Sequence, residues 1–259
     1  MTPEQIDEAA AQIVAAREQQ TMLKGLGESA PLTMEDGYKI QDAFMNSWSS
    51  PLAGWKVGAT APKVQEVYGV DQPFYGPFYE PDVYASPAHP GAANYGHHCV
   101  ECEFAFRFAR DLPPRDENFT REEILDAVDV LIPAFELISP RFDTLLQDNV
   151  ALAAADCGLN GGLVLGEPYE GWRQLDLASH PVVLTVDDEK IAEGTGANVL
   201  RHPYNVLDWL ANTLPQRGLG LKAGEIVSTG TCTGFHYIEP GQKAVADYGE
   251  IGQIEITFV

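Results

Sequence analysis

The sequence predicts an α+β fold that is mostly β, with a pair of helices at the N-terminus. Three observations support this prediction. Apolar residues follow helical spacing through about the first 50 residues. From residue 51 onward, short β-like runs alternate with Gly, Pro and Asp, and only two helical segments interrupt them. Because strands greatly outnumber possible crossover helices, we do not expect a doubly wound parallel sheet. We divide the chain into a helical region (1–50) and a β-rich domain (51–259), which is expected to form one structural unit and to carry the functional site.

The N-terminal helices are predicted from the way each one starts. TPEQ at residues 2–5 is a capping-box pattern with proline at the first helical position, and apolar residues then recur at helical spacing. TMED at residues 33–36 opens a second helix after a loop that contains glycine and proline.

The β-rich part is predicted from runs in which apolar and β-branched residues dominate. Two helices are expected among these runs, one from Thr120, which forms a capping pattern with Glu123, and one from His202-Pro203. The β-like runs are GWKVGAT, VECEFAFRF, VLIPAFELI, GGLVLG, PVVLTVDDEKIAEG, EIVST, AVADYG and QIEITFV.

The charge of the chain excludes some classes of partner. Its 259 residues include 38 Asp and Glu against 16 Lys and Arg, which gives a formal net charge of −22. Such a surface repels phosphate backbones, so no nucleic acid partner is expected. No apolar run reaches the roughly 20 residues that span a bilayer, and the polar, acidic stretch MTPEQIDEAAAQIV is not expected to act as a signal peptide, so no membrane partner is expected either. The sparse cysteines indicate reduced thiols in a cytoplasmic protein: Cys99, Cys102, Cys157 and Cys232.

The stretch HHCVECEFAFRF at residues 97–108 contains two competing metal-site patterns, C-x-x-C and E-x-E. Apolar and other residues alternate cleanly over residues 98–108, which predicts a strand. In a strand Cys99 and Cys102 point to opposite faces and cannot share one ion, so a zinc or redox thiolate site is not expected. Glu101 and Glu103 point to the same face and can converge on Mg²⁺ or Mn²⁺.

Glu136 strengthens the carboxylate interpretation, because it lies in the apolar run VLIPAFELI. A buried carboxylate requires a partner to offset its lost hydration. A metal ion shared with Glu101 and Glu103 would be such a partner. Two alternatives stay open at this point: a salt bridge from Glu136 to a distant basic residue, and a solvated acidic strand in a non-catalytic binding protein.

Lys56 is also a lone charged residue in a β-like run. It lies in GWKVGAT, with Gly54 and Gly58 on its own strand face. Glycines beside a lysine leave room for a ligand to approach the backbone. A partly desolvated lysine is suited to proton transfer or to pairing with a carboxylate. The alternative is a lysine that extends into solvent from a β edge.

These residues resemble the fumarylacetoacetate hydrolase superfamily, and within it the branch of 2-keto-4-pentenoate hydratases and 4-oxalocrotonate decarboxylases. The resemblance covers the chain from about residue 33 to the C-terminus. It rests on the order and spacing of several segments, namely LTMEDGYKIQ, GWKVGAT, YGVDQPFYGPF, VECEFAF, PAFELIS, HPYNVLDWLANTL and LKAGEIVSTGTCTG…EPGQKAVADYGEIGQIEITF.

The resemblance implies a rolled mixed sheet with helices at the N-terminus. It matches the three glutamates discussed above to the metal-binding carboxylates of the family, and Lys56 to the lysine beside the substrate. It also matches Asp71, in YGVDQP, to an acid of a lid-like segment, and Thr231, in the TGT-x-x-G loop, to a residue near the substrate carboxylate. The implied metal is Mg²⁺ or Mn²⁺, the implied substrate is a small anionic 2-oxo acid, and the implied assembly is a homo-oligomer.

One segment departs from the family pattern. Where a serine is expected in an A-D-N-x-S-type segment, this chain reads AADCGLNGG, with Leu159 and Asn160 at that place. Asn160 can hydrogen-bond a substrate oxygen but cannot act as a general acid. The resemblance implies a hydratase that converts a 2-hydroxy-2,4-dienoate to a 4-hydroxy-2-oxo acid, with a 4-oxalocrotonate-type decarboxylase as the alternative. Acylpyruvate hydrolysis ranks third, because no histidine lies between Gly58 and Gly76 to activate water.

Overall fold

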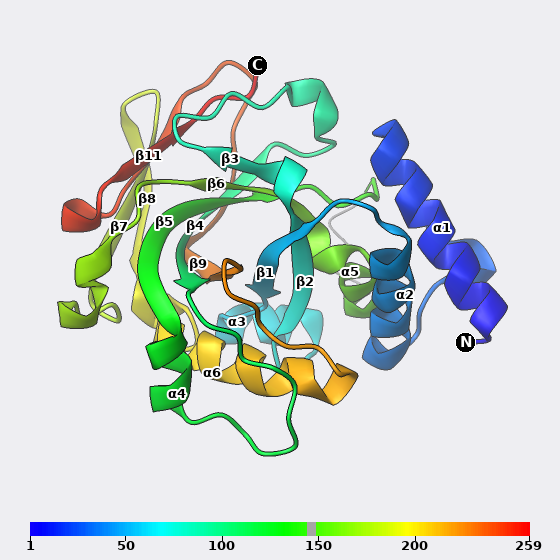
Figure 1. The fold of residues 1–259 in the computed structure, drawn as a ribbon. Coiled ribbons are helices and arrows are strands. Elements are labelled where there is room, and N and C mark those ends of the chain that lie inside the picture. Colours follow the sequence, from blue (N-terminus) through cyan, green and yellow to red (C-terminus); the bar gives the residue numbers. More distant parts are fainter. Residues whose placement is uncertain (144–148) are drawn as a thin grey trace.

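The computed structural model describes residues 1–143 and 149–259 and has the α+β architecture predicted from the sequence (Figure 1). Among the residues described, no helix is long and apolar enough to cross a membrane. The α-helices are α1 (Pro3–Gln19), α2 (Met34–Ser47), α3 (Pro62–Tyr68), α4 (Arg121–Ala127), α5 (Val150–Ala155) and α6 (Pro203–Thr213). The strands are β1 (Leu52–Gly58), β2 (Phe74–Tyr79), β3 (Val83–Ala85), β4 (Cys99–Phe108), β5 (Val128–Ile138), β6 (Asn160–Leu165), β7 (Pro181–Val186), β8 (Glu189–Thr195), β9 (Ile226–Tyr237), β10 (Ala244–Asp247) and β11 (Gln253–Ile256).

The strands form two sheets, and the larger one is rolled. Its order is β2-β1-β9-β4-β5-β6-β3, and it is mixed because β1 pairs with β9, and β3 with β6, in parallel. The roll brings β2 against β6, where the Asn160 amide donates a hydrogen bond to the Pro77 carbonyl at 2.7 Å. The second sheet, β11-β10-β7-β8, is antiparallel throughout. Figure 1 shows the rolled sheet around the centre of the molecule, with α6 beneath it.

Strand β4 separates the main hydrophobic core from the interior of the roll. Its predicted apolar face is fully buried and joins a core that includes residues of α6 and the second sheet, with Val100, Cys102, Phe104, Phe106 and Phe108 as its members. The predicted alternation is therefore confirmed. The opposite face of β4 carries Glu101 and Glu103 on the inner side of the roll, so these acids do not lie on a solvated strand face.

The N-terminal helices form as predicted and pack against the sheet. Thr2 makes both bonds of the capping box with Gln5, and Thr33 caps α2. Ile13 of α1 and Phe44 of α2 share a hydrophobic cluster with Tyr79 of β2 and with residues of β4 and β5. The helical region thus shares a core with the sheet, while its treatment as a separate region ending at residue 50 stays a prediction.

Several elements were not predicted. Strands β2 and β3 and the short helices α3 and α5 were absent from our sequence interpretation, and β9 continues well beyond the predicted run EIVST. Helix α3 has only 7 residues and no side-chain cap at Ala61. Its signals are Pro62 at its start and Gly69, with φ of 65°, just after its end. Strand β9 extends across irregularities opposite Glu103, where its alternation breaks.

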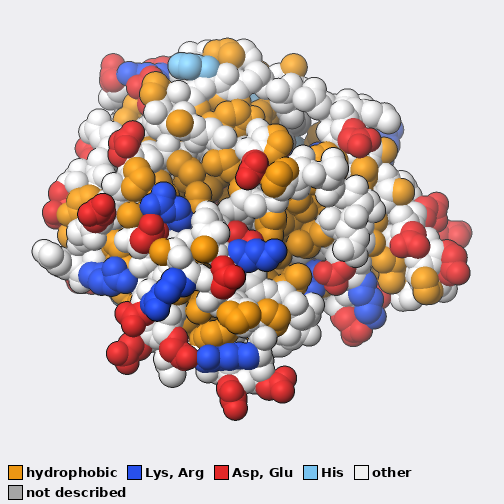
Figure 2. Space-filling view, viewed as in Figure 1, with side chains coloured by type: hydrophobic (Ala, Val, Ile, Leu, Met, Phe, Trp, Pro, Cys, Tyr) orange, Lys and Arg blue, Asp and Glu red, His pale blue; other side chains and the backbone are white. Residues whose placement is uncertain are grey.

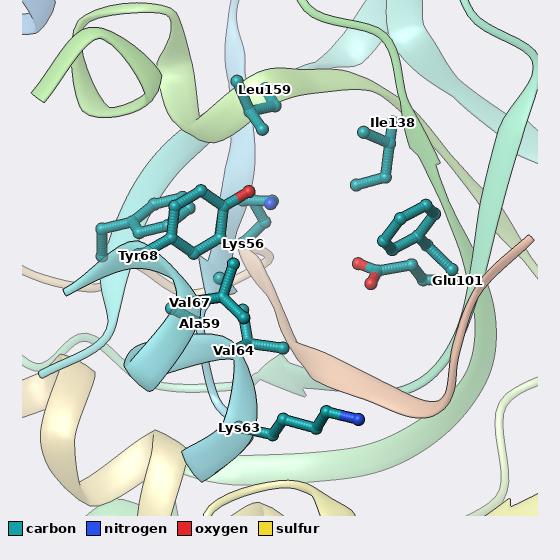
Figure 3. A pocket seen from close by; sticks show the side chains of 12 residues that line it. Lys56, Ala59, Lys63, Val64, Val67, Tyr68, Glu101, Ile138 and Leu159 are labelled. Carbon is teal, nitrogen blue, oxygen red and sulfur yellow. The ribbon is translucent and has the colours of Figure 1, made fainter. Parts of the chain in front are cut away.

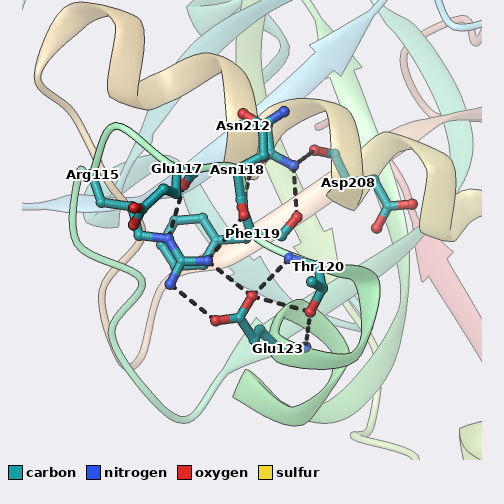
Figure 4. A network of polar contacts seen from close by, with 8 residues as sticks. All are labelled: Arg115, Glu117, Asn118, Phe119, Thr120, Glu123, Asp208 and Asn212. Atoms are coloured by element: carbon teal, nitrogen blue, oxygen red, sulfur yellow. Dashed lines mark hydrogen bonds and ion pairs between the residues drawn. The ribbon is translucent and has the colours of Figure 1, made fainter.

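The predicted helices at Thr120 and His202 are confirmed as α4 and α6, and a polar network joins them (Figure 4). Arg115 donates two hydrogen bonds to the Glu123 carboxylate, each at 2.9 Å, while Glu123 closes the capping box with Thr120. The side chain of Asn212 in α6 bonds both the N–H and the carbonyl of Phe119, at 2.7 and 3.2 Å. This network fixes the segment before α4 against α6, away from the interior of the roll.

Candidate functional site

Three glutamates from two neighbouring strands meet inside the roll. Glu101 and Glu136 are directly opposite each other in the antiparallel pairing of β4 with β5, and Glu103 follows on the same face of β4. One carboxylate oxygen from each of the three lies within 4.8 Å of the other two. Like charges directly opposite in a sheet are destabilising, so this arrangement calls for a cation.

Glu103 is the most firmly held of the three. It is fully buried, and its Oε2 accepts hydrogen bonds from the Ser228 hydroxyl and from the Gly230 N–H, the latter at 2.8 Å. Gly230 has a φ of 101°, and a Cβ there would lie 2.0 Å from the Thr60 hydroxyl oxygen, so no other residue fits. Strand β9 therefore orients one oxygen of Glu103 and leaves the other, Oε1, without a hydrogen-bond partner among the described residues.

Lys56 lies at the centre of the site and is 2% exposed. Its ammonium is 2.8 Å from Oε1 of Glu136 and donates a hydrogen bond to the Gly158 carbonyl at 2.7 Å. Strand β1 lies between β2 and β9, so Lys56 is not an edge lysine that extends into solvent. The salt-bridge alternative for Glu136 is correct in part: its partner is Lys56, yet Glu136 also belongs to the carboxylate cluster.

The electrostatics of the site favour an added cation. Burial raises the pKa of Glu101 to about 8, with repulsion from Glu136 adding to the effect and Lys56 opposing it. Burial likewise raises the pKa of Glu103, as do Glu136 and Glu101, and burial raises the pKa of Glu136 in spite of Lys56. Burial alone would lower the pKa of Lys56, but the charges of Glu136 and Glu101 outweigh it, so the Lys56 pKa is raised.

The residues present fit a divalent metal. Fully ionised, the three carboxylates carry three negative charges and Lys56 one positive charge, which leaves two negative charges for a divalent ion to neutralise. Both oxygens of Glu136 and Oε1 of Glu103 are buried without a hydrogen-bond donor among the described residues, although Glu136 has its ion pair. Carboxylate oxygens are the preferred ligands of Mg²⁺ and Mn²⁺. The predicted ligand set is therefore brought together, with Lys56 beside it.

A cavity of about 400 Å³ opens beside Lys56 and Glu101 (Figure 3). Helix α3 supplies one wall, with Lys63 extending along the margin of the cavity in this view, while Ile138 and Leu159 close other sides. Figure 2 shows a hollow at the centre of one face of the molecule, where hydrophobic side chains gather and charged side chains lie around them. The lining is mostly apolar and includes Val64, Val67, Tyr68, Phe74, Ile138, Leu159 and Phe235.

Three other predicted site residues lie outside the cavity wall as the structure describes it. Asp71 is exposed in the turn that follows α3. Thr231 lies opposite Glu103 in the β4–β9 pairing, and its hydroxyl donates to the Gly234 carbonyl at 2.9 Å. Asn160 is buried, and its side-chain NH₂ group donates the hydrogen bond to the Pro77 carbonyl that is described above. Of these three residues, only Thr231 is placed next to the carboxylate cluster, because it pairs with Glu103 across the two strands.

Sequence reasoning missed the residues that support the site and those that shape the cavity. Ser228 and Gly230 lie in the run STGTCTG, from which only Thr231 was selected, and their spacing of two along a strand was the available signal. Lys63 and Tyr68 belong to α3, which could have been found from proline at its start and glycine after its end.

Comparisons with known proteins identify relatives over most of the chain. The model of the fumarylacetoacetate (FAA) hydrolase C-terminal family matches residues 80–259. A 2-keto-4-pentenoate hydratase from Paraburkholderia xenovorans is 30% identical over 266 aligned residues, which cover 100% of this chain and 96% of the relative. A 2-oxo-hept-4-ene-1,7-dioate hydratase from Escherichia coli is 28% identical, with 94% of each chain covered.

A solved structure shares the fold over the whole chain. It is a 4-oxalocrotonate decarboxylase from Pseudomonas putida G7, complexed with magnesium and adipate, and it covers 100% of this chain and 99% of its own. The TM-score is 0.91 and the sequence identity 23%, a level at which the likeness shows the fold alone.

Proposed function

Because this chain belongs to the fumarylacetoacetate hydrolase family, we propose that it is a divalent-metal-dependent hydratase that converts a 2-hydroxy-2,4-dienoate to a 4-hydroxy-2-oxo acid. The observation that carries the proposal is the cluster of Glu101, Glu103 and Glu136 beside Lys56, at the edge of an apolar cavity. Hydratases similar to this chain over nearly its whole length support the choice of reaction.

The carboxylate cluster would hold the metal, which we propose to be Mg²⁺ or Mn²⁺. When bound, the ion supplies a Lewis acid for the oxo and carboxylate oxygens of a 2-oxo acid. Glu103 is oriented for this role by Ser228 and Gly230, and Glu136 by Lys56. Glu101 is only partly buried and lines the cavity, so it is the ligand nearest to an incoming substrate.

Lys56 would move protons in the cavity. Ketonisation of the dienoate requires a proton at C5 and the loss of the proton from the 2-hydroxyl, which leaves a double bond between C3 and C4. Water then adds its oxygen at C4 and a proton at C3. The ammonium of Lys56 lines the cavity and is held from two sides, which suits a positioned acid.

The cavity wall bears on the substrate as well. A second carboxylate at the far end of the substrate would have to leave water for a lining of Val64, Val67 and Leu159, which is unfavourable. Lys63 is the one cation in the described lining apart from Lys56, and it is exposed at the margin. We therefore propose an apolar substituent at this end of the substrate.

The remaining assignments stay proposals of the same kind. Asp71 would reach the substrate only if α3 and the turn after it closed over the cavity, which would remove water from the site. Thr231 would act near the substrate carboxylate, and Asn160 would contact a substrate oxygen. We also propose that the protein is a cytoplasmic homo-oligomer.

A decarboxylase acting on a 4-oxalocrotonate-type substrate is the second candidate. Leu159 favours it, because this side chain lines the cavity where the family pattern led us to expect a hydroxyl, and decarboxylation benefits from a dry apolar pocket. The decarboxylase of the same fold supports it too.

One experiment separates the two candidates. The purified protein is incubated with Mg²⁺ and either a 2-hydroxy-2,4-dienoate or an oxalocrotonate, and both CO₂ and the 4-hydroxy-2-oxo acid are measured. The proposal requires hydrated product that depends on the metal and disappears with a chelator. Release of CO₂ without hydrated product would overturn it in favour of the decarboxylase.

A further inference from the structure

The turn between α5 and β6 has an unusual backbone. Cys157, Gly158 and Leu159 are consecutive, and all three have positive φ values, of 52°, 72° and 68°. Only glycine adopts this left-handed conformation without a steric penalty from Cβ, so Cys157 and Leu159 are both strained. A strained turn persists only where surrounding contacts hold it, and such turns are concentrated at functional sites.

Arg141 and Asp156 supply those contacts. The backbone N–H of Arg141 donates to Oδ2 of Asp156 at 2.7 Å. The guanidinium of Arg141 lies 3.6 Å from Oδ1 of the same carboxylate. The same guanidinium donates to the carbonyls of Ser139 and of Asn160, the residue directly after the turn. The Asp156 side chain is 1% exposed. One ion pair therefore ties down the residue before the turn and the residue after it.

The turn is also packed tightly between β2 and Lys56. A Cβ at Gly76 of β2 would lie 1.9 Å from the Cys157 carbonyl oxygen, and a Cβ at Gly158 would lie 2.8 Å from Cδ of Lys56. In this arrangement the Gly158 carbonyl accepts the hydrogen bond from the Lys56 ammonium at 2.7 Å. The turn thus provides the second of the two groups that fix the ammonium, the first being Glu136.

We infer that Asp156 and Arg141 are positioning residues for Lys56, which act by holding the strained turn so that the Gly158 carbonyl fixes the lysine ammonium. The role in turnover rests on the proposed function, while the role in holding Lys56 does not. A buried ion pair stabilises a fold weakly, because the loss of hydration offsets much of the attraction. The Arg141–Asp156 pair therefore contributes more by fixing the conformation of the turn than by adding to the stability of the fold.

The test compares Asp156→Asn with Asp129→Asn. Asp129 in β5 forms another arginine–aspartate pair, 2.7 Å from Arg107 of β4, but it is partly exposed and lies near the end of β5 that is farther from the turn. Asp156→Asn should lower kcat about 10- to 100-fold, because small displacements of a reacting group are costly. Its affinity for Mg²⁺ should stay within about twofold of wild type, since the three carboxylates and the charge of Lys56 are kept, and its affinity for a saturated 2-oxo acid should fall less than kcat, because Leu159 of the turn lines the cavity. Asp129→Asn should change neither kcat nor these affinities.

A spectroscopic measurement tests the same inference without any reaction. A buried, hydrogen-bonded lysine ammonium exchanges its protons slowly and gives a resolved ¹H–¹⁵N signal, which Lys56→Met identifies by removing it. This signal should broaden beyond detection in Asp156→Asn and persist in Asp129→Asn. Arg141→Lys, which keeps the charge but cannot bridge both ends of the turn, should behave like Asp156→Asn.

The results distinguish the positioning role of Asp156 and Arg141 from the proposed hydratase function. If Asp156→Asn and Arg141→Lys keep the Lys56 signal, or if Asp156→Asn keeps wild-type kcat, the inference is wrong. If wild-type protein hydrates no dienoate while the signal is still lost in Asp156→Asn, the proposed function fails and the positioning role stands.

Discussion

The ammonium of Lys56 lies 2.8 Å from the carboxylate of Glu136, although the two residues are on β1 and β5, which are not neighbours in the sheet. The rolled sheet brings them together across its interior. This ion pair links the proposed proton donor directly to a proposed metal ligand, so the metal, the carboxylates and the lysine should respond to one another when any one of them is changed.

Replacement of Glu136 tests the metal site. Glu136→Gln keeps the shape of the side chain but removes one of the two excess negative charges, so Mg²⁺ affinity should fall at least tenfold and activity should be abolished. Calorimetry with Mg²⁺ measures the first effect and the hydration assay the second. Cys99→Ser combined with Cys102→Ser is the control, because these thiols lie on opposite faces of β4 and should not affect metal content. Loss of metal in that double variant would restore the thiolate interpretation.

Lys56→Met tests proton transfer. If Lys56 donates a proton to the substrate, kcat should fall by about 10²–10⁴, with a smaller effect on KM. Steady-state kinetics with a saturating metal concentration separate the two parameters. A rise in KM alone would show that the lysine only binds the anionic substrate.

Metal affinity should depend on pH in a defined direction. Without metal, burial raises the pKa of Glu101 to about 8, so below this pH the folded protein holds a proton that must leave before Glu101 can bind an ion. For one competing proton, Mg²⁺ affinity should fall about tenfold for each pH unit below 8 and level off above it. Calorimetry in buffers of different ionisation enthalpy counts the protons released. An affinity that does not change between pH 6 and 8.5 would contradict this account.

The cavity wall predicts a preference among substrates. For 2-hydroxydienoates that carry longer alkyl groups, kcat/KM should rise about fourfold for each added methylene until the cavity is full. Phe235→Ala should weaken this trend, because Phe235 lines the cavity and is 48% exposed without substrate. Ile191→Ala is the matched control, since Ile191 is 42% exposed on β8 and is absent from the cavity lining.

A preference for dicarboxylate substrates would give a different experimental result. A dicarboxylate would need a cation at the margin of the cavity, where Lys63 lies. If a dicarboxylate is the better substrate and Lys63→Ala removes the advantage, the apolar-tail prediction is wrong.

The carboxylate site was predictable from the sequence because two of its ligands follow from strand periodicity. Glu101 and Glu103 share a face in any strand that buries Phe104 and Phe106, so local alternation was enough. Glu136 was recognisable as a lone acid in an apolar run. The pairing of Glu136 with Lys56 was not predictable from spacing, because it depends on how far the sheet rolls.

The cavity wall was harder to predict. Helix α3 has only 7 residues, so the helical spacing of Val64, Val67 and Tyr68 is too short to reveal it. The left-handed turn at Cys157 and Leu159 contradicts the local preference of both residues, and only tertiary contacts such as those of Arg141 explain it. Asp71, Asn160 and Thr231 were assigned through resemblance alone, and the structure does not bring them into the cavity lining that it describes.

Helix α3 lies in the connection between β1 and β2, and none of its residues is buried. Substitutions at the exposed Lys63 or Val67 therefore change the wall of the cavity while leaving the core intact, and surface changes of this kind have small effects on stability. The glutamates and Lys56, in contrast, are fixed within the rolled sheet. Over evolutionary time, the range of accepted substrates can consequently diversify through this one connection while the reaction itself is conserved.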